Sequence, residues 1–277
     1  MADQLKYSDM LKQACLSSKD KLADSDIAEE QITQEDRALF ASAPEVPHGE
    51  RTTRVKTTKD KTTKLNAQIH AMNGFSAIEQ LKFLRATKLL LHVVNSGEFQ
   101  KWFLQSELKF TERTAGGKTY SNQELYDYIV SGSDQLDVNK DFDIDIDVTL
   151  YTPRWPLSKV CGYTNPGTRR TWINERFFAK YDFAAIANNI IHEYCHKLGF
   201  DHFKDWDTSV PYQVGNMVEK LARAQVSQLH EPLEDWLDSL PQIIFDNGGQ
   251  PIDIEAIKRE ASSHAMATTS RKTCVLQ

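Results

Sequence analysis

The most informative part of this chain is the stretch Ile191-His192-Glu193-Tyr194-Cys195-His196-Lys197-Leu198-Gly199-Phe200-Asp201-His202. Residues four apart on an α-helix lie one above the other on the same face, so His192 and His196 can present two imidazoles to one cation. Glu193 follows the first histidine directly, and its carboxylate can take a proton from a metal-bound water. The stretch therefore predicts a metal site on a helix.

The residues on either side support this helix. Residues 183–191 are apolar and rich in alanine, with neither glycine nor proline, and Asp182 is a suitable N-cap. Gly199 can adopt the left-handed conformation that ends a helix, and the turn can bring His202 back toward His196. Three neutral imidazoles leave one position of the metal open, which is typical of a catalytic zinc site.

His192, Glu193, His196, Gly199 and His202 follow the pattern HExxHxxGxxH, which resembles the elongated zinc-binding motif of the metzincin metallopeptidases. HExxH alone recurs by chance in unrelated helices, whereas the longer pattern is much more specific. The resemblance implies three histidine ligands to Zn2+ and a glutamate general base. It also implies a cleft in which an extended peptide substrate lies along an edge strand.

The resemblance further implies an α+β fold: a metzincin-like catalytic domain with a twisted mixed sheet over a zinc-binding active-site helix, and a helical C-terminal subdomain. We expect a polar, flexible N-terminal extension at residues 1–66, the metallopeptidase domain at 67–258 and a flexible tail at 259–277. The basic, threonine-rich run before residue 66 reads as a solvated linker.

Local patterns predict strands ahead of the motif. Residues 142–150 alternate apolar and mainly acidic side chains, as in a half-exposed strand. The turn Asn165-Pro166-Gly167 predicts a hairpin between residues 159–163 and 168–174. By the metzincin resemblance, residues 160–163 form the edge strand that pairs with the substrate.

The sequence departs from the family after the motif. Metzincins place a methionine in a tight turn beneath the zinc, and here residues 209–212 are the favoured turn, with Pro211 in the methionine's place. Met217 is the alternative. Tyr212 would then be a catalytic hydrogen-bond donor to the tetrahedral intermediate or an outer zinc ligand, unless it is an ordinary core tyrosine. A helix is expected over residues 212–226.

The leading hypothesis is a zinc-dependent endopeptidase that cleaves a protein or peptide substrate. In one alternative, an HExxH metallopeptidase of another clan takes its third ligand from Asp205, Asp207 or Glu219. In a second, the chain is a binding protein that keeps a zinc fold without turnover, which the intact Glu193 argues against. Cys195 is not expected to be a ligand, because a thiolate together with three histidines would close the site.

Composition limits the partners. The 277 residues are 40% hydrophobic, enough for a sizeable core, and the net charge of -6 gives no general attraction to nucleic acid. No segment approaches the ~20 apolar residues that a transmembrane helix needs.

Cysteine usage and the chain ends bear on localisation. The four cysteines lack a pairing pattern and no signal peptide is recognisable, so we expect a cytoplasmic protein or one exported without a cleaved signal. Residues Cys274-Val275-Leu276-Gln277 fit the C-a-a-X prenylation pattern, and a prenylated Cys274 would attach the chain to a host membrane.

Overall fold

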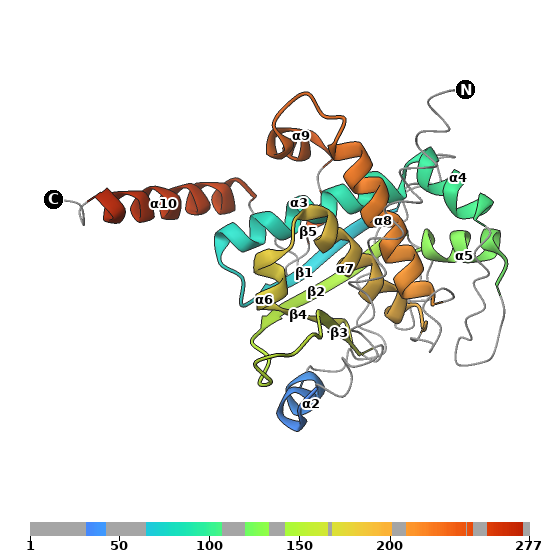
Figure 1. Cartoon of the computed structure of the whole chain (residues 1–277), viewed down its shortest axis with the longest axis horizontal. Coiled ribbons are helices and arrows are strands. Elements are labelled where there is room, and N and C mark those ends of the chain that lie inside the picture. The colour runs from blue at the N-terminus through green and yellow to red at the C-terminus, as the bar shows by residue number, and fades with distance from the viewer. Residues whose placement is uncertain are drawn as a thin grey trace.

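The computed structural model describes residues 32–42, 65–106, 120–132, 142–165, 168–200, 209–241, 243–245 and 254–273. These residues combine α-helices with one mixed β-sheet (Figure 1). The α+β class predicted from the sequence is therefore confirmed. No helix in these ranges is long and apolar enough to cross a bilayer.

The sheet has the strand order β3-β4-β2-β1-β5. Its strands are β1 (Asn66–Asn73), β2 (Asp143–Tyr151), β3 (Gly162–Thr164), β4 (Arg170–Asn174) and β5 (Ile244–Phe245). Strand β1 pairs in parallel with β2 and β5, and β2 pairs in parallel with β4. Among these strands β3 alone is antiparallel; it pairs with β4 and forms an edge of the sheet, so the predicted hairpin is confirmed.

Strand β2 shows the alternation that its sequence predicts, because successive side chains of a strand point to opposite faces. Alternate residues are buried in the main core: Ile144, Ile146 and Val148. On the other face, Asp145 Oδ1 lies 2.7 Å from His70 Nε2 of β1, and Asp147 accepts a hydrogen bond from Arg170 of β4. Asp145 and Asp147 of β2 are thus used in contacts between strands.

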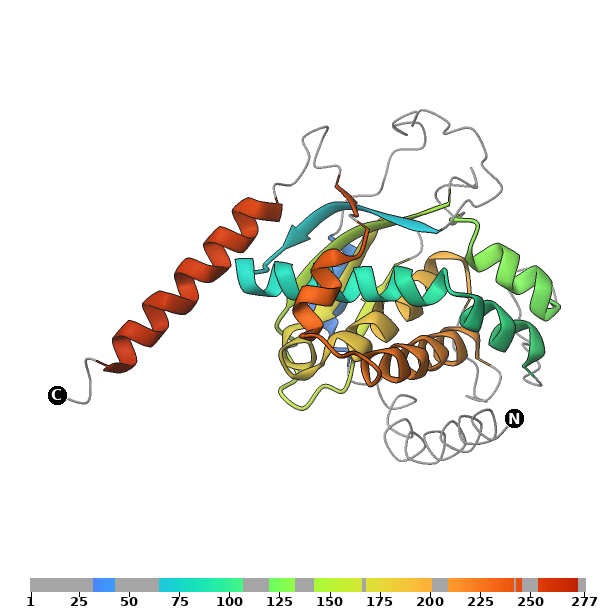
Figure 2. The ribbon, with the colours of Figure 1, turned by 90° about the horizontal axis from the view of Figure 1, so that it is seen from above.

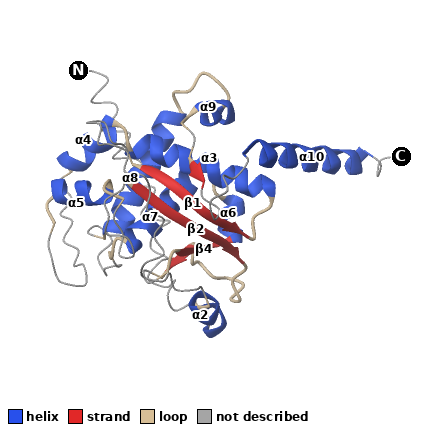
Figure 3. Cartoon of the chain, turned by 180° about the vertical axis from the view of Figure 1, so that it is seen from behind, coloured by secondary structure: helices blue, strands red, loops and turns tan. Residues whose placement is uncertain are grey.

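Helices cover one face of the sheet, as Figures 2 and 3 show from two directions. The main ones are α3 (Ala77–Val94), α7 (Phe183–Lys197) and α8 (Val210–Val226), and α7 packs against α3, α8 and β3. Shorter helices are α4 (Gly97–Gln105), α5 (Asn122–Ile129), α6 (Glu175–Lys180) and α9 (Leu233–Ser239). The helix that carries the histidine motif therefore lies at the centre of this layer.

Two further helices lie at the margins of the fold (Figure 1). Helix α2 (Gln34–Ala41) belongs to the segment expected to be a flexible extension, yet Phe40 is buried against strands β2, β3 and β4. Helix α10 (Ile254–Thr273) spans the expected boundary between catalytic domain and tail. Its residues Ile257 and Ala261 belong to the main core.

Candidate active site

Helix α7 begins and ends where the sequence predicts. Asp182 caps its N-terminus by accepting a hydrogen bond from the N–H of Ala185 at 2.9 Å. Gly199 takes a left-handed φ of 96°, and its N–H donates to the carbonyl of His196 at 2.9 Å. The chain therefore turns sharply away just after the two histidines.

The two described histidines of the motif lie side by side. The ring centroids of His192 and His196 are 5.1 Å apart, with planes inclined by 74°. Nδ1 of His196 lies 2.6 Å from the carbonyl oxygen of Phe200. A carbonyl oxygen can only accept a hydrogen bond, so Nδ1 carries a proton, which in a neutral imidazole leaves the lone pair on Nε2. Metal-ligating histidines are held in this way.

Glu193 is buried beneath the edge strand β3, with 4% of its surface exposed. Burial raises the pKa of Glu193, against the opposing effects of His196, a hydrogen bond with Thr164, and Lys197. In the described part of the chain its Oε2 has no hydrogen-bond partner. A Cβ added at Gly162 would overlap Glu193 Oε1, so the carboxylate fits because β3 has a glycine there.

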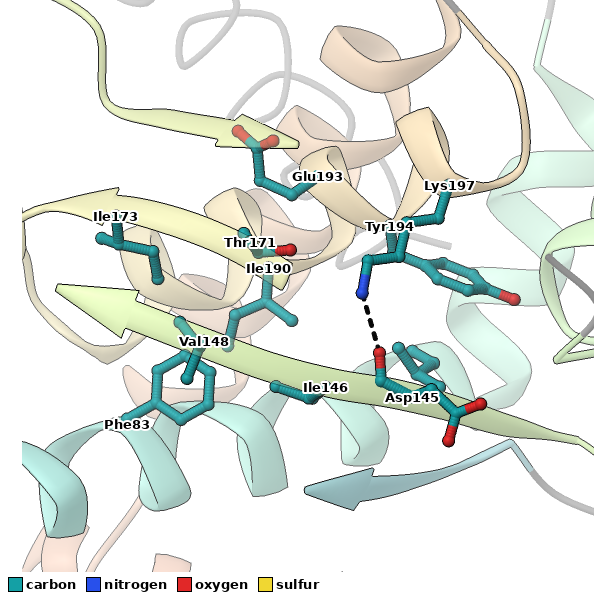
Figure 4. Close-up of a pocket in the computed structure, with 11 residues that line it drawn as sticks. Phe83, Asp145, Ile146, Val148, Thr171, Ile173, Ile190, Glu193, Tyr194 and Lys197 are labelled. Carbon is teal, nitrogen blue, oxygen red and sulfur yellow. Dashed lines mark hydrogen bonds between the residues drawn. The ribbon is translucent and has the colours of Figure 1, made fainter. Parts of the chain in front are cut away.

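A small cavity of about 20 Å3 lies between the sheet and α7 (Figure 4), enough for about one water molecule. Glu193 and Lys197 both line it. Lys197 Nζ donates to the carbonyl of Asp145 at 3.0 Å and to that of Arg169 at 2.5 Å. Lys197 thereby ties the end of the motif helix to the sheet.

Tyr212 lies next to the histidines, with its ring centroid 4.7 Å from that of His192. The prediction that residues 209–212 form a separate tight turn is wrong, because Ser209 is the N-cap of α8 and Pro211 lies in its first turn. Proline suits this position, since its φ is fixed and it has no N–H to leave unsatisfied. Met217 lies further along α8 and is buried in the main core.

Three candidate ligands lie outside the described residues: His202, Asp205 and Asp207. Across the described ranges no group of three His, Cys, Asp or Glu side chains could hold a metal ion. Both carboxylate oxygens of Glu219 already accept hydrogen bonds, from Asn188 Nδ2 at 2.7 Å and from Arg223 Nε at 3.0 Å. Cys195 is buried in the main core.

The residues that the structure brings together fit Zn2+. They supply two neighbouring imidazoles, one of them with Nδ1 held by a backbone carbonyl, and a buried carboxylate oxygen that has no hydrogen-bond donor among the described residues. Imidazole nitrogen is a common zinc ligand, and a carboxylate beside the metal is the usual base in such sites.

Comparison of the chain with family models, with curated proteins and with solved structures gives no match.

The sequence does not predict a role in the site for two residues, Gly162 and Asn189. A glycine within a predicted strand marks a close approach of another group, which is the signal that Gly162 offers. Asn189 is four residues before Glu193, and this spacing places both on one face of α7. Neither signal says which group lies opposite, because that depends on where β3 packs.

Proposed function

We propose that the chain is a zinc-dependent endopeptidase with a metzincin-like site, which hydrolyses peptide bonds of a protein substrate. One observation carries the proposal: a buried carboxylate, with one oxygen that no described residue satisfies, lies beside two neighbouring imidazoles and beneath an antiparallel edge strand. Each part of this arrangement has a use in peptide hydrolysis.

His192 and His196 would hold the metal together with His202, the third histidine of the motif. Zn2+ supplies Lewis-acid activation of the attacking water and of the scissile carbonyl. Glu193 accepts a proton from the water and delivers it to the leaving nitrogen. The hydrogen bond between His196 and Phe200 keeps the imidazole in the tautomer that can bind a metal.

The edge strand β3 supports the assignment of the substrate cleft. One side of β3 pairs with β4, and an extended peptide can add to an exposed edge through main-chain hydrogen bonds. This strand packs directly against α7. A metzincin-like architecture implies the same order of edge strand and motif helix. Tyr212, in contact with His192, can donate a hydrogen bond to the carbonyl oxygen under attack.

The proposal is tested by metal analysis and by digestion of a proteome-derived peptide library, with new termini identified by mass spectrometry. We expect one zinc per chain and cleavage by the wild type. Glu193→Gln is nearly isosteric and should keep zinc and fold, but lose at least ~10²–10⁴-fold in turnover, because the base is gone. His202→Ala should lose most of the zinc, since two imidazoles bind more weakly than three.

Two results would contradict these assignments. If Glu193→Gln keeps more than about a tenth of the turnover with zinc bound, Glu193 is not the base. Unchanged zinc content in His202→Ala points to a carboxylate third ligand. Absence of both zinc and cleavage in the wild type removes the proposed function.

A further inference from the structure

Helix α7 presents two hydrogen-bonding side chains to the edge strand, one helical turn apart. Asn189 and Glu193 are four residues apart and share a face of the helix. Both approach Gly162 of β3: a Cβ at this residue would overlap Glu193 Oε1 and would lie 3.0 Å from Asn189 Nδ2. The glycine thus leaves room for both side chains at the point where β3 meets the motif helix.

Each of these side chains has a buried oxygen that accepts no hydrogen bond from the described part of the chain. Among the residues that the structure describes, neither Asn189 Oδ1 nor Glu193 Oε2 has a hydrogen-bond partner. The neighbouring Asn188 differs, because its Nδ2 donates to Glu219 at 2.7 Å and links α7 to α8. A buried acceptor without a donor is costly, so these two oxygens require hydrogen-bond donors from outside the described residues, and a bound substrate can supply them.

We propose that Asn189 is a further substrate-binding residue, whose Oδ1 accepts a hydrogen bond from the N–H of the scissile peptide bond. This role rests on the proposed peptidase activity. In the reaction the water oxygen bonds to the carbonyl carbon and the C–N bond breaks. Both protons of the water finish on the nitrogen, which leaves as an ammonium group beside a product carboxylate. Asn189 holds the N–H that the amide already carries, while Glu193 brings the first new proton to the nitrogen lone pair.

The test compares two substrates that differ only at the scissile bond. One is the peptide that the wild type cleaves fastest in the library digestion, and the other is the matched ester, in which oxygen replaces the scissile N–H. Asn189→Leu has a similar size but cannot accept a hydrogen bond. We expect it to lower kcat/KM about ten-fold on the peptide and less than about two-fold on the ester.

Two further variants separate this role from a structural one. Asn189→Asp keeps an acceptor oxygen of the same shape and should restore most of the rate on the peptide. Asn188→Leu loses the bond to Glu219 and should affect peptide and ester equally. Zinc content and a thermal melt are measured on the same samples, and Asn189→Ala replaces Asn189→Leu if the latter does not fold.

Equal losses on peptide and ester in Asn189→Leu, or no loss on either, would overturn the role of Asn189 while leaving the peptidase assignment intact. A wild-type chain that cleaves no peptide of the library refutes the proposed function, and with it this role.

Discussion

At the scale of single residues, Gly162 matters to the site because glycine has no side chain. Its φ lies outside the left-handed region, so a substitution there is resisted by contact rather than by backbone conformation. The contact is with Glu193 and Asn189, which lie 27 to 31 residues later in the chain. A single methyl group would therefore displace the carboxylate on which the proposed chemistry depends.

We expect Gly162→Ala to retain zinc but to lower turnover by about 10²-fold, because a displacement of about 1 Å in a reacting group can cost that much. Turnover on the library peptide and zinc content are the measurements. Gly97→Ala is the matched control, since a Cβ there has no heavy atom within 4 Å, and it should behave as the wild type. Wild-type turnover in Gly162→Ala would show that the carboxylate is not confined by β3.

At the scale of elements, α7 and α8 are joined by a charged network at the N-terminus of α7. Arg223 of α8 donates to Asp182 Oδ2 at 2.6 Å and to Glu219 Oε1 at 2.7 Å. Burial raises the pKa of Asp182, but the N–H of Ala185 and the guanidinium of Arg223 outweigh it and hold that pKa below its usual range. The cap of the motif helix is thus held by the helix that carries Tyr212.

Asp182→Ala should lower the free energy of unfolding by about 1 kcal/mol at pH 7. Because the folded-state pKa is depressed, this contribution is complete above the unfolded value of about 3.9 and is lost as pH falls through the folded value. Urea unfolding at pH 7 and at acid pH should therefore show a shrinking difference between the two proteins. Asp182→Asn retains a capping oxygen, so its free energy of unfolding should fall by less. If the destabilisation in Asp182→Ala did not change with pH, the ionised carboxylate would not be the group that caps the helix.

At the scale of the whole molecule, the edge strand β3 is held from both faces. On the side away from α7, the ring of Tyr163 in β3 stacks on that of Phe40 in α2. Their centroids are 4.2 Å apart and their planes are inclined by 12°. Phe40 also packs edge-on against Tyr151 of β2. Asp36 of α2 accepts a hydrogen bond from the N–H of Arg154, in the connection that leads to β3. A segment far from the motif in sequence thus contributes to the strand proposed to bind substrate.

Phe40→Ala should lower the free energy of unfolding by about 3 kcal/mol, because the ring is 2% exposed and fills an aromatic cluster. The neighbouring Leu39 is 37% exposed, so Leu39→Ala should change the free energy of unfolding by less than about 0.5 kcal/mol. Urea unfolding of both variants provides the comparison. If both variants changed the free energy of unfolding by an equally small amount, α2 would not unfold together with the sheet.

The elements whose signals are local were predictable from the sequence. The cap at Asp182, the left-handed end at Gly199 and the alternation of β2 all follow from the chemistry of neighbouring residues. The same holds for the side-by-side histidines of α7, which need nothing beyond the helical repeat. The sequence predicts a tight turn at residues 209–212, where the structure has the start of α8, because proline suits both a tight turn and the first turn of a helix.

Only the tertiary structure decided what lies against the motif helix. The sequence does not say that Gly162 confines Glu193, that Glu219 is engaged by Asn188 and Arg223, or that Phe40 lies on the far side of β3. These contacts join residues distant in the chain, so they depend on the order of the strands and on how the helices pack over them. Local propensity and residue spacing do not determine the order of the strands or the packing of the helices. Burial of apolar surface in the folded chain determines both.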